Sequence, residues 1–150
     1  MEHGNSEVQS DKPKGFNFDK AFVTDSDLED QGAWDEIYMD GESLKVKVAR
    51  KGNHHYKKMM RNELMRNKRK LDRDDQGAID LFEGITIRVM AKTILLGWGE
   101  LLVNGKPLEF SRENAEMVLA NEDFRKEIDG ISESFDLYKK AQDEEIDQCR

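Results

Sequence analysis

The chain has 150 residues, the length of one domain, and 37% of them are hydrophobic, enough for one modest core. Its net charge of −8 at pH 7 argues against general nucleic-acid binding, because a phosphate-binding surface is normally basic. The single cysteine, Cys149, can build neither a disulfide framework nor a zinc cluster, and no uncharged run is long enough to span a membrane.

Three regions differ in composition. Residues 1–15 hold one branched apolar residue and no aromatic residue, so they cannot bury enough surface to offset the entropy of ordering, and we expect a disordered arm. Residues 16–142 are expected to form a single, mainly helical domain. Residues 143–150 are polar and acidic, and we expect a frayed tail.

A β-hairpin is predicted near residues 33–50. Asp40-Gly41 lies between two runs of alternating polarity, which is a strong short-range hairpin signal. The second run would place Leu44, Val46 and Val48 on one face and its two lysines on the other.

Apolar residues recurring every three or four positions predict helices after the hairpin. We expect four of them, over 54–71, 78–98, 112–120 and 122–141, with N-caps at Asn53, Ser111 and Asn121. The second is the expected core helix, with Ile79, Phe82, Ile85, Val89, Thr93 and Leu96 along its buried side. The fourth repeats this pattern at Phe124, Ile128, Ile131, Phe135 and Tyr138. The fold class is therefore mainly α (α+β), with about four helices and a small N-terminal β-hairpin.

Residues 96–114 form a glycine-punctuated stretch that could be a ligand loop or a structural corner. It contains neither the Walker spacing nor a recognisable nucleophile motif, so the structural corner is the favoured interpretation. Gly97 is expected to end the core helix, and Trp98 to fill the corner as a plug. Asn104-Gly105 is expected to make the turn, which Pro107 stiffens. Phe110 is expected to anchor the next helix and Ser111 to cap it.

No catalytic, metal or cofactor site is expected from the sequence. His54 and His55 are adjacent, so on a helix they point about 100° apart and would not chelate one ion together. The acidic tail lacks the alternating oxygen ligands and the central glycine of a calcium loop. We therefore expect a protein that is not an enzyme.

Charge is arranged in blocks along the chain. Residues 19–42 carry nine acids against one lysine, whereas residues 50–73 carry ten Lys or Arg against two acids. The blocks suggest complementary surfaces, within one molecule or between copies, or simply solvated faces. Self-association through them is one expectation.

The basic helix is open to three interpretations. Its apolar residues can pack on the core, its basic residues can contact phosphates, or its flexible methionines can bind apolar partners. On the third interpretation the partner-binding residues would be Tyr56, Met59, Met60 and Met65.

The stretch AKTILLGWGELLVNGKPLEFSRENAEMVLANEDFRKEI resembles the C-terminal half of the small tail assembly chaperones of long-tailed bacteriophages. The shared pattern is a Leu-Leu-Gly-Trp turn, a Gly-Lys-Pro-Leu loop, a Phe-Ser-x-Glu-Asn helix start and a final helix opening with Asp-Phe-Arg. Upstream, AWDEIYMDGESLKVKVARKGNHHYKKMMR is similar to the family's acidic hairpin and aromatic-basic helix. The resemblance covers roughly residues 19–140. The loop LLVNGKPLEF departs from it in being more apolar than the family's Asp-rich loop.

The resemblance implies a non-enzymatic protein of the host cell cytoplasm that binds the tape measure protein. Such chaperones keep it soluble until tail tube protein subunits polymerise around it, and a programmed frameshift often yields a second, longer product. The alternative is a minor structural protein of the phage tail or neck that stays in the virion. Neither reading involves nucleic acid, a membrane or a cofactor.

Overall fold

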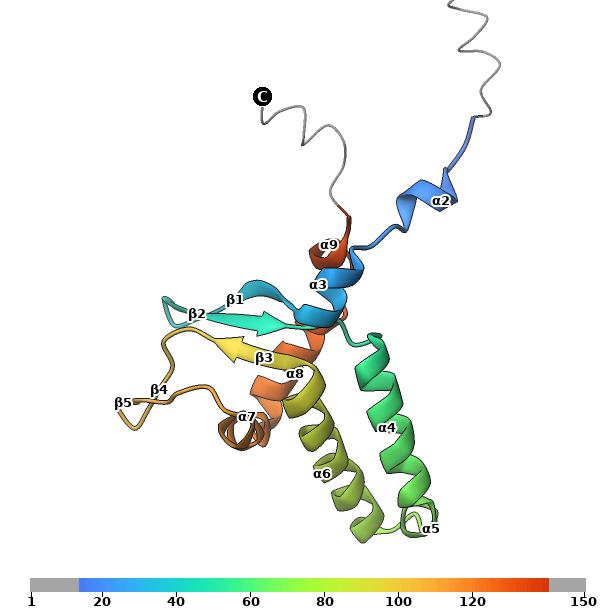
Figure 1. Cartoon of the computed structure of the whole chain (residues 1–150). Helices are drawn as coiled ribbons and strands as arrows, with labels where there is room; N and C mark the ends of the chain where they lie inside the picture. Colours follow the sequence, from blue (N-terminus) through green and yellow to red (C-terminus); the bar gives the residue numbers. More distant parts are fainter. Residues whose placement is uncertain (1–13, 141–150) are drawn as a thin grey trace, which may run out of the picture.

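A computed structural model describes residues 14–140 (Figure 1). The disordered arm expected over 1–15 lies outside this range except for two exposed residues, and the tail expected over 143–150 lies wholly outside it. The helices are α2 (Phe18–Ala21), α3 (Ser26–Gln31), α4 (His54–Arg66), α5 (Lys68–Leu71), α6 (Gln76–Thr93), α7 (Arg112–Leu119), α8 (Glu122–Ser132) and α9 (Phe135–Tyr138). The strands are β1 (Ala33–Met39), β2 (Glu42–Val48), β3 (Leu95–Trp98), β4 (Leu102–Val103) and β5 (Lys106–Pro107).

The expected fold class is confirmed. Four helices in the described range have eight residues or more, namely α4, α6, α7 and α8, and they correspond to the four predicted from periodicity. They pack beside a three-stranded antiparallel sheet of order β1-β2-β3, while β4 and β5 form a separate short hairpin.

The predicted hairpin is present as β1 and β2. Asp40 and Gly41 both have positive φ, 54° and 79°, as a two-residue type I′ turn requires. This turn sets the register, with Met39 opposite Glu42, and it directs Val46 and Val48 to the buried face as expected.

The core helix is shorter than predicted, because the chain leaves the helix after Thr93 and forms β3. Strand β3 pairs with the free edge of β2, which would otherwise present unsatisfied amides and carbonyls, and the Ala49 amide donates to the Ile94 carbonyl oxygen at 2.8 Å. The expected role of Gly97 as the helix stop is therefore wrong; Gly97 lies in the strand opposite Lys47.

A register irregularity between Lys47 and Val48 changes which side chains of β3 are buried. In a regular strand, residues three apart face opposite sides of the sheet. The bulge turns both Leu95 and Trp98 toward the helices, and both are buried.

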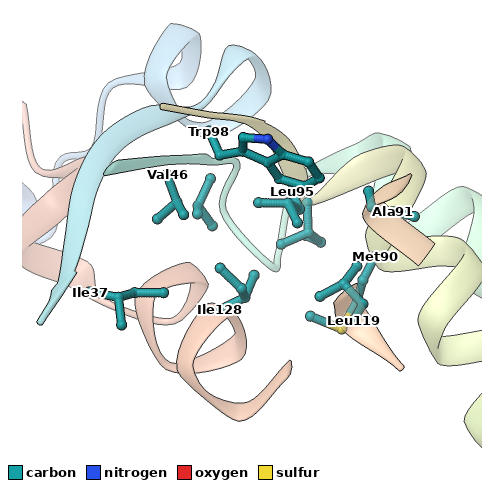
Figure 2. Close-up of a cluster of buried hydrophobic side chains, with 11 residues drawn as sticks. Ile37, Val46, Met90, Ala91, Leu95, Trp98, Leu119 and Ile128 are labelled. Atoms are coloured by element: carbon teal, nitrogen blue, oxygen red, sulfur yellow. The ribbon is translucent and has the colours of Figure 1, made fainter. Parts of the chain in front are cut away.

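The core lies between this sheet and the helices (Figure 2). Strands contribute Ile37, Val46, Val48, Leu95 and Trp98, and helices contribute Met90, Ala91, Ala115, Leu119 and Ile128, with Ile94 at the junction of α6 and β3. Most of these side chains come from segments far apart in the sequence, so the core joins the hairpin to the C-terminal helices.

The expected buried side of the core helix is only partly correct. Ile85, Val89 and Thr93 are buried, but Ile79 is 59% exposed and Phe82 is 49% exposed. The reason is visible in Figure 1: the first half of α6 runs with α4 away from the sheet toward α5, so few elements cover it there.

The predicted helix over 122–141 is interrupted at Glu133 and Ser134 and becomes α8 and α9. Ser134 caps α9 by accepting from the Leu137 amide. The change of direction carries Tyr138 into the interior, where its hydroxyl donates to the Val48 carbonyl oxygen at 2.7 Å. In a continuous helix, Tyr138 would have stayed on the same apolar side as Phe135.

Two short helices precede the hairpin and were not predicted. Asp25 is the N-cap of helix α3, and its carboxylate accepts from the Asp27 and Leu28 amides, so an N-cap signal was present in the sequence. A bridge between Thr24 and Lys139 and a bond from the Asp25 amide to the Tyr138 carbonyl oxygen fix this segment against α9.

Candidate partner-binding groove

Helix α4 begins at a firmly held N-cap. The Asn53 side-chain oxygen accepts from the Tyr56 amide at 2.9 Å, which is the cap that the sequence predicts. Its side-chain nitrogen donates to the carbonyl oxygens of Arg50 and Thr93, so the buried Asn53 also connects the end of β2 with the end of α6. The helix itself ends at Arg66 rather than continuing to residue 71, because Asn67 closes it by donating to the Glu63 carbonyl oxygen.

No residue of α4 is fully buried, so its apolar side is a surface as much as a packing face. This side forms a depression of about 560 Å³, which we call the α4–α5 groove. It is lined by Tyr56, Lys57, Met60, Arg61, Leu64, Met65, Lys68, Leu71 and Asp72.

A second depression, of about 230 Å³, adjoins the groove and shares Tyr56 and Met60 with it. Its other walls come from α6 and α8, including Phe82 and Thr86 of α6. The two depressions therefore form one continuous surface along α4, in which half-exposed aromatic rings and flexible methionines lie beside one another.

The structure separates the four residues proposed for partner binding. Tyr56, Met60 and Met65 lie together in the α4–α5 groove, and Met65 is 69% exposed. Met59 instead lines a different depression with His55, Lys58 and Lys92. Leu64 and Leu71 lie on the same side of the chain as Met60 and also line the groove, while Phe82, which was expected in the core, lines the adjoining depression.

The charges around the groove are mostly basic. Lys57 and Arg61 line it and have no ion-pair partner among residues 14–140, while Lys68 pairs with Asp72 at 2.8 Å. Lys51, in the adjoining depression, is near Asp129; burial opposes its charge, but the hydrogen bond and charge of Asp129 outweigh burial and raise the pKa of Lys51. Lys57 and Arg61 therefore give the groove itself a net positive charge.

Two further interactions hold the groove in place. Glu63 pairs with Arg66 on its own helix and with Arg88 on α6, each at 3.0 Å, which ties α4 to α6. Burial raises the pKa of Tyr56, so its hydroxyl stays neutral and available for hydrogen bonding. The groove thus lies on a helix that an ion pair joins to α6.

The corner residues lie in β3 and in the segment that follows it, and none of them lines this groove. Trp98 is buried, donates from Nε1 to the Leu108 carbonyl oxygen at 2.9 Å, and meets the Phe110 ring edge-on at 4.8 Å. Asn104 and Gly105 have φ of 53° and 77° and turn β4 into β5, where Pro107 pairs with Leu102. The Ser111 hydroxyl accepts from the Asn114 amide at 3.0 Å, as expected for the cap of α7.

Within residues 14–140 there is no group of three or more His, Cys, Asp or Glu side chains placed to hold a metal ion. His54 and His55 contact one another, with ring centroids 4.2 Å apart. Over the same range, no helix combines the length and the apolar character needed to cross a membrane.

Comparison with known proteins identifies a family. The family model described as YdaY prophage protein matches residues 39–148, which include β2, the α4–α5 groove and the corner. No curated protein and no solved structure gives a significant match.

Proposed function

This chain belongs to the YdaY prophage protein family, and from that premise we propose that it is a phage tail assembly chaperone. In this proposal it binds the tape measure protein in the host cell cytoplasm and keeps it soluble until tail tube protein polymerises around it. Two observations support the proposal: the phage origin of the family and the ordered small motifs of residues 91–128 that resemble such chaperones.

The observation that carries the proposal is the α4–α5 groove with its adjoining depression. A chaperone for a long helical protein needs exposed apolar surface that accepts varied side chains and releases them later. Methionine suits this task because it is unbranched and repacks easily, and Met60 and Met65 line the groove. The lysines and arginines around them keep this apolar surface hydrated until a partner covers it.

Co-expression with the tape measure protein of the same phage tests the proposal directly. We expect the tape measure protein to be soluble with this chain and aggregated without it, as measured by its share of the cleared lysate. A tape measure protein that is equally soluble alone would overturn the assignment.

A matched pair of variants tests the groove itself. Met60→Lys with Met65→Lys places two charges in the groove and should reduce the soluble tape measure protein several-fold. Met59→Lys, on the other depression of the same helix, should leave it unchanged. Unaltered far-UV circular dichroism shows that the variants fold, and equal effects of the two variants would exclude the groove as the binding site.

The alternative, a minor structural protein of the tail or neck, predicts a different location for the chain. Mass spectrometry of purified virions should find it absent or in trace amounts if it is a chaperone. Abundant peptides in mature particles would favour the structural protein. A slippery heptamer near the stop codon, with an open alternative frame, would add support for the chaperone.

A further inference from the structure

Residues 16–22 carry a cluster of three phenylalanines that almost nothing covers. Phe16, Phe18 and Phe22 are 73%, 70% and 57% exposed, and their rings contact one another at 5.3 to 5.8 Å. Phe22 also meets Phe135 edge-on at 5.6 Å, and helix α2 buries no residue. Figure 1 shows α2 standing away from the rest of the molecule. Such an aromatic patch favours burial against an apolar surface.

The phenylalanine cluster lies apart from the α5 end of the α4–α5 groove of its own chain (Figure 1). Thr24 is bridged to Lys139, and the Lys140 amide donates to the Val23 carbonyl oxygen at 3.0 Å. Phe22 therefore lies within two residues of a fixed point, a span of at most about 7 Å. Helix α5, which supplies one end of the groove, lies at the opposite end of the molecule from α2 (Figure 1).

The cluster and the groove are complementary in charge as well as in polarity. Asp19 and Lys20 leave residues 16–22 without net charge, so the complementary charge comes from the four acids between residues 25 and 30, of which Glu29 also pairs with Arg50. The groove presents Lys57 and Arg61, which have no ion-pair partner among the described residues. Because both segments belong to this chain, the partner that matches both properties is a second copy.

We propose that residues 16–22 of one copy dock into the α4–α5 groove of the next. The contact joins two different surfaces, so it is heterologous, and repeated head-to-tail docking builds rings or open chains rather than a closed two-fold dimer. The same groove then has two competing occupants, a neighbouring copy and a client. This inference needs only this chain and stands whether or not the client is a tape measure protein.

Sedimentation velocity of the full chain over a range of concentrations tests the proposal. The wild-type mass should rise with concentration beyond that of a dimer, and it should fall at high salt because the charges are exposed. Phe16→Asp with Phe18→Asp removes the docking segment, and Arg61→Glu with Met65→Glu closes the groove; each variant alone should stay monomeric. All four positions are exposed, so neither variant should impair folding.

Mixing the two variants provides the decisive readout. The segment variant keeps an intact groove, and the groove variant keeps an intact segment, so an equimolar mixture should form a 1:1 dimer that cannot extend. Lys58→Glu with Met59→Glu, which makes matched changes outside the groove, should associate like wild type.

A monomeric wild type at all concentrations, or a segment variant that associates like wild type, would overturn the proposal. A mixture that stays monomeric would overturn it too. The segment variant should still solubilise a tape measure protein because its groove is unchanged. Failure of the wild type in that assay would therefore count against the proposed function while leaving self-docking intact.

Discussion

Trp98 connects three parts of the structure through one side chain. Its indole lies in the core, its Nε1 donates to the Leu108 carbonyl oxygen, and its ring packs nearly perpendicular to that of Phe110, just before the cap of α7. The residue therefore holds the β4–β5 hairpin and the start of α7 against the sheet.

Substitutions of Trp98 should separate packing from hydrogen bonding. Trp98→Ala should lower the free energy of unfolding by ~3 to 5 kcal/mol, because it leaves a cavity in the core. Trp98→Phe keeps most of the ring and should cost less, including about 1 kcal/mol for the lost bond to Leu108. Urea titration followed by circular dichroism measures the free energy of unfolding of both variants. An equal decrease in the two would show that the shape of the indole, rather than its buried volume, determines the stability.

Tyr138 makes folding sensitive to alkaline pH. Burial raises the pKa of its hydroxyl well above the ordinary 10.0, although the charge of Arg50 opposes the shift. The folded state therefore holds this proton more tightly than the unfolded state does. The resulting stability is fully present below about pH 10 and is lost as the pH rises further.

Tyr138→Phe should remove that part of the alkaline dependence. At neutral pH the variant should lose about 1 kcal/mol, because the Val48 carbonyl oxygen loses its donor. Above pH 10 its stability should fall less steeply than that of wild type, with Lys51, whose pKa is also raised, contributing to the slope that remains. Denaturation midpoints measured at several pH values check this, and parallel curves for the two proteins would contradict it.

At the scale of elements, helix α6 has two different halves. Its C-terminal half is enclosed by the sheet, α7 and α8, whereas its N-terminal half runs beside α4 with exposed apolar residues. The continuous periodicity of the sequence gives no sign of this difference, because a repeat of three and four marks a helix side but not what covers it.

Two alanine substitutions on α6 should therefore differ strongly. Ile85→Ala removes a fully buried side chain and should cost 2 to 5 kcal/mol, a range of about that size being usual in cores. Phe82→Ala should cost well under ~2 kcal/mol, since nearly half of its surface is exposed. Chemical denaturation compares them, and a greater loss for Phe82 would mean that the groove is more tightly packed than the structure indicates.

Sequence reasoning succeeded where structure is decided locally. The type I′ turn at Asp40-Gly41 and the caps at Asn53, Ser111 and Asn121 depend on neighbouring residues, and all are present. It failed at residues 94–98, where helical periodicity was outweighed by pairing with an edge of β2 that lies nearly 50 residues earlier. The break at Ser134 was not predicted for the same reason. It lets Tyr138 bond to Val48, which is distant in the sequence.

The candidate groove was half predicted. Methionines on a basic helix pointed to Tyr56, Met60 and Met65, but only the packing of α4 against α6 and α8 shows that Met59 is elsewhere and that Phe82 joins the surface. The exposure of the phenylalanines at residues 16–22 could not be read from composition, since aromatic residues more often indicate a core.

At the scale of the whole molecule, the two charge blocks of the sequence meet where Glu29 pairs with Arg50 and extend from there in different directions. The acidic block contains α2, α3 and β1, and the basic block contains α4 and α5, at the other end of the molecule from α2 (Figure 1). The molecule therefore has an acidic end and a basic end, and this arrangement favours head-to-tail assembly.

The bridge between Thr24 and Lys139 has a consequence for chain connectivity. The segment before β1 and the segment after α9 are adjacent there. The elements could therefore be connected in a different order along the chain and keep the same arrangement in space. A circular permutant opened at the exposed Asn104-Gly105 turn would keep β1, β2 and β3 together while turning the present ends into an internal loop. Helix α4 would then follow α7, α8 and α9 in the chain, yet it would face the same neighbours.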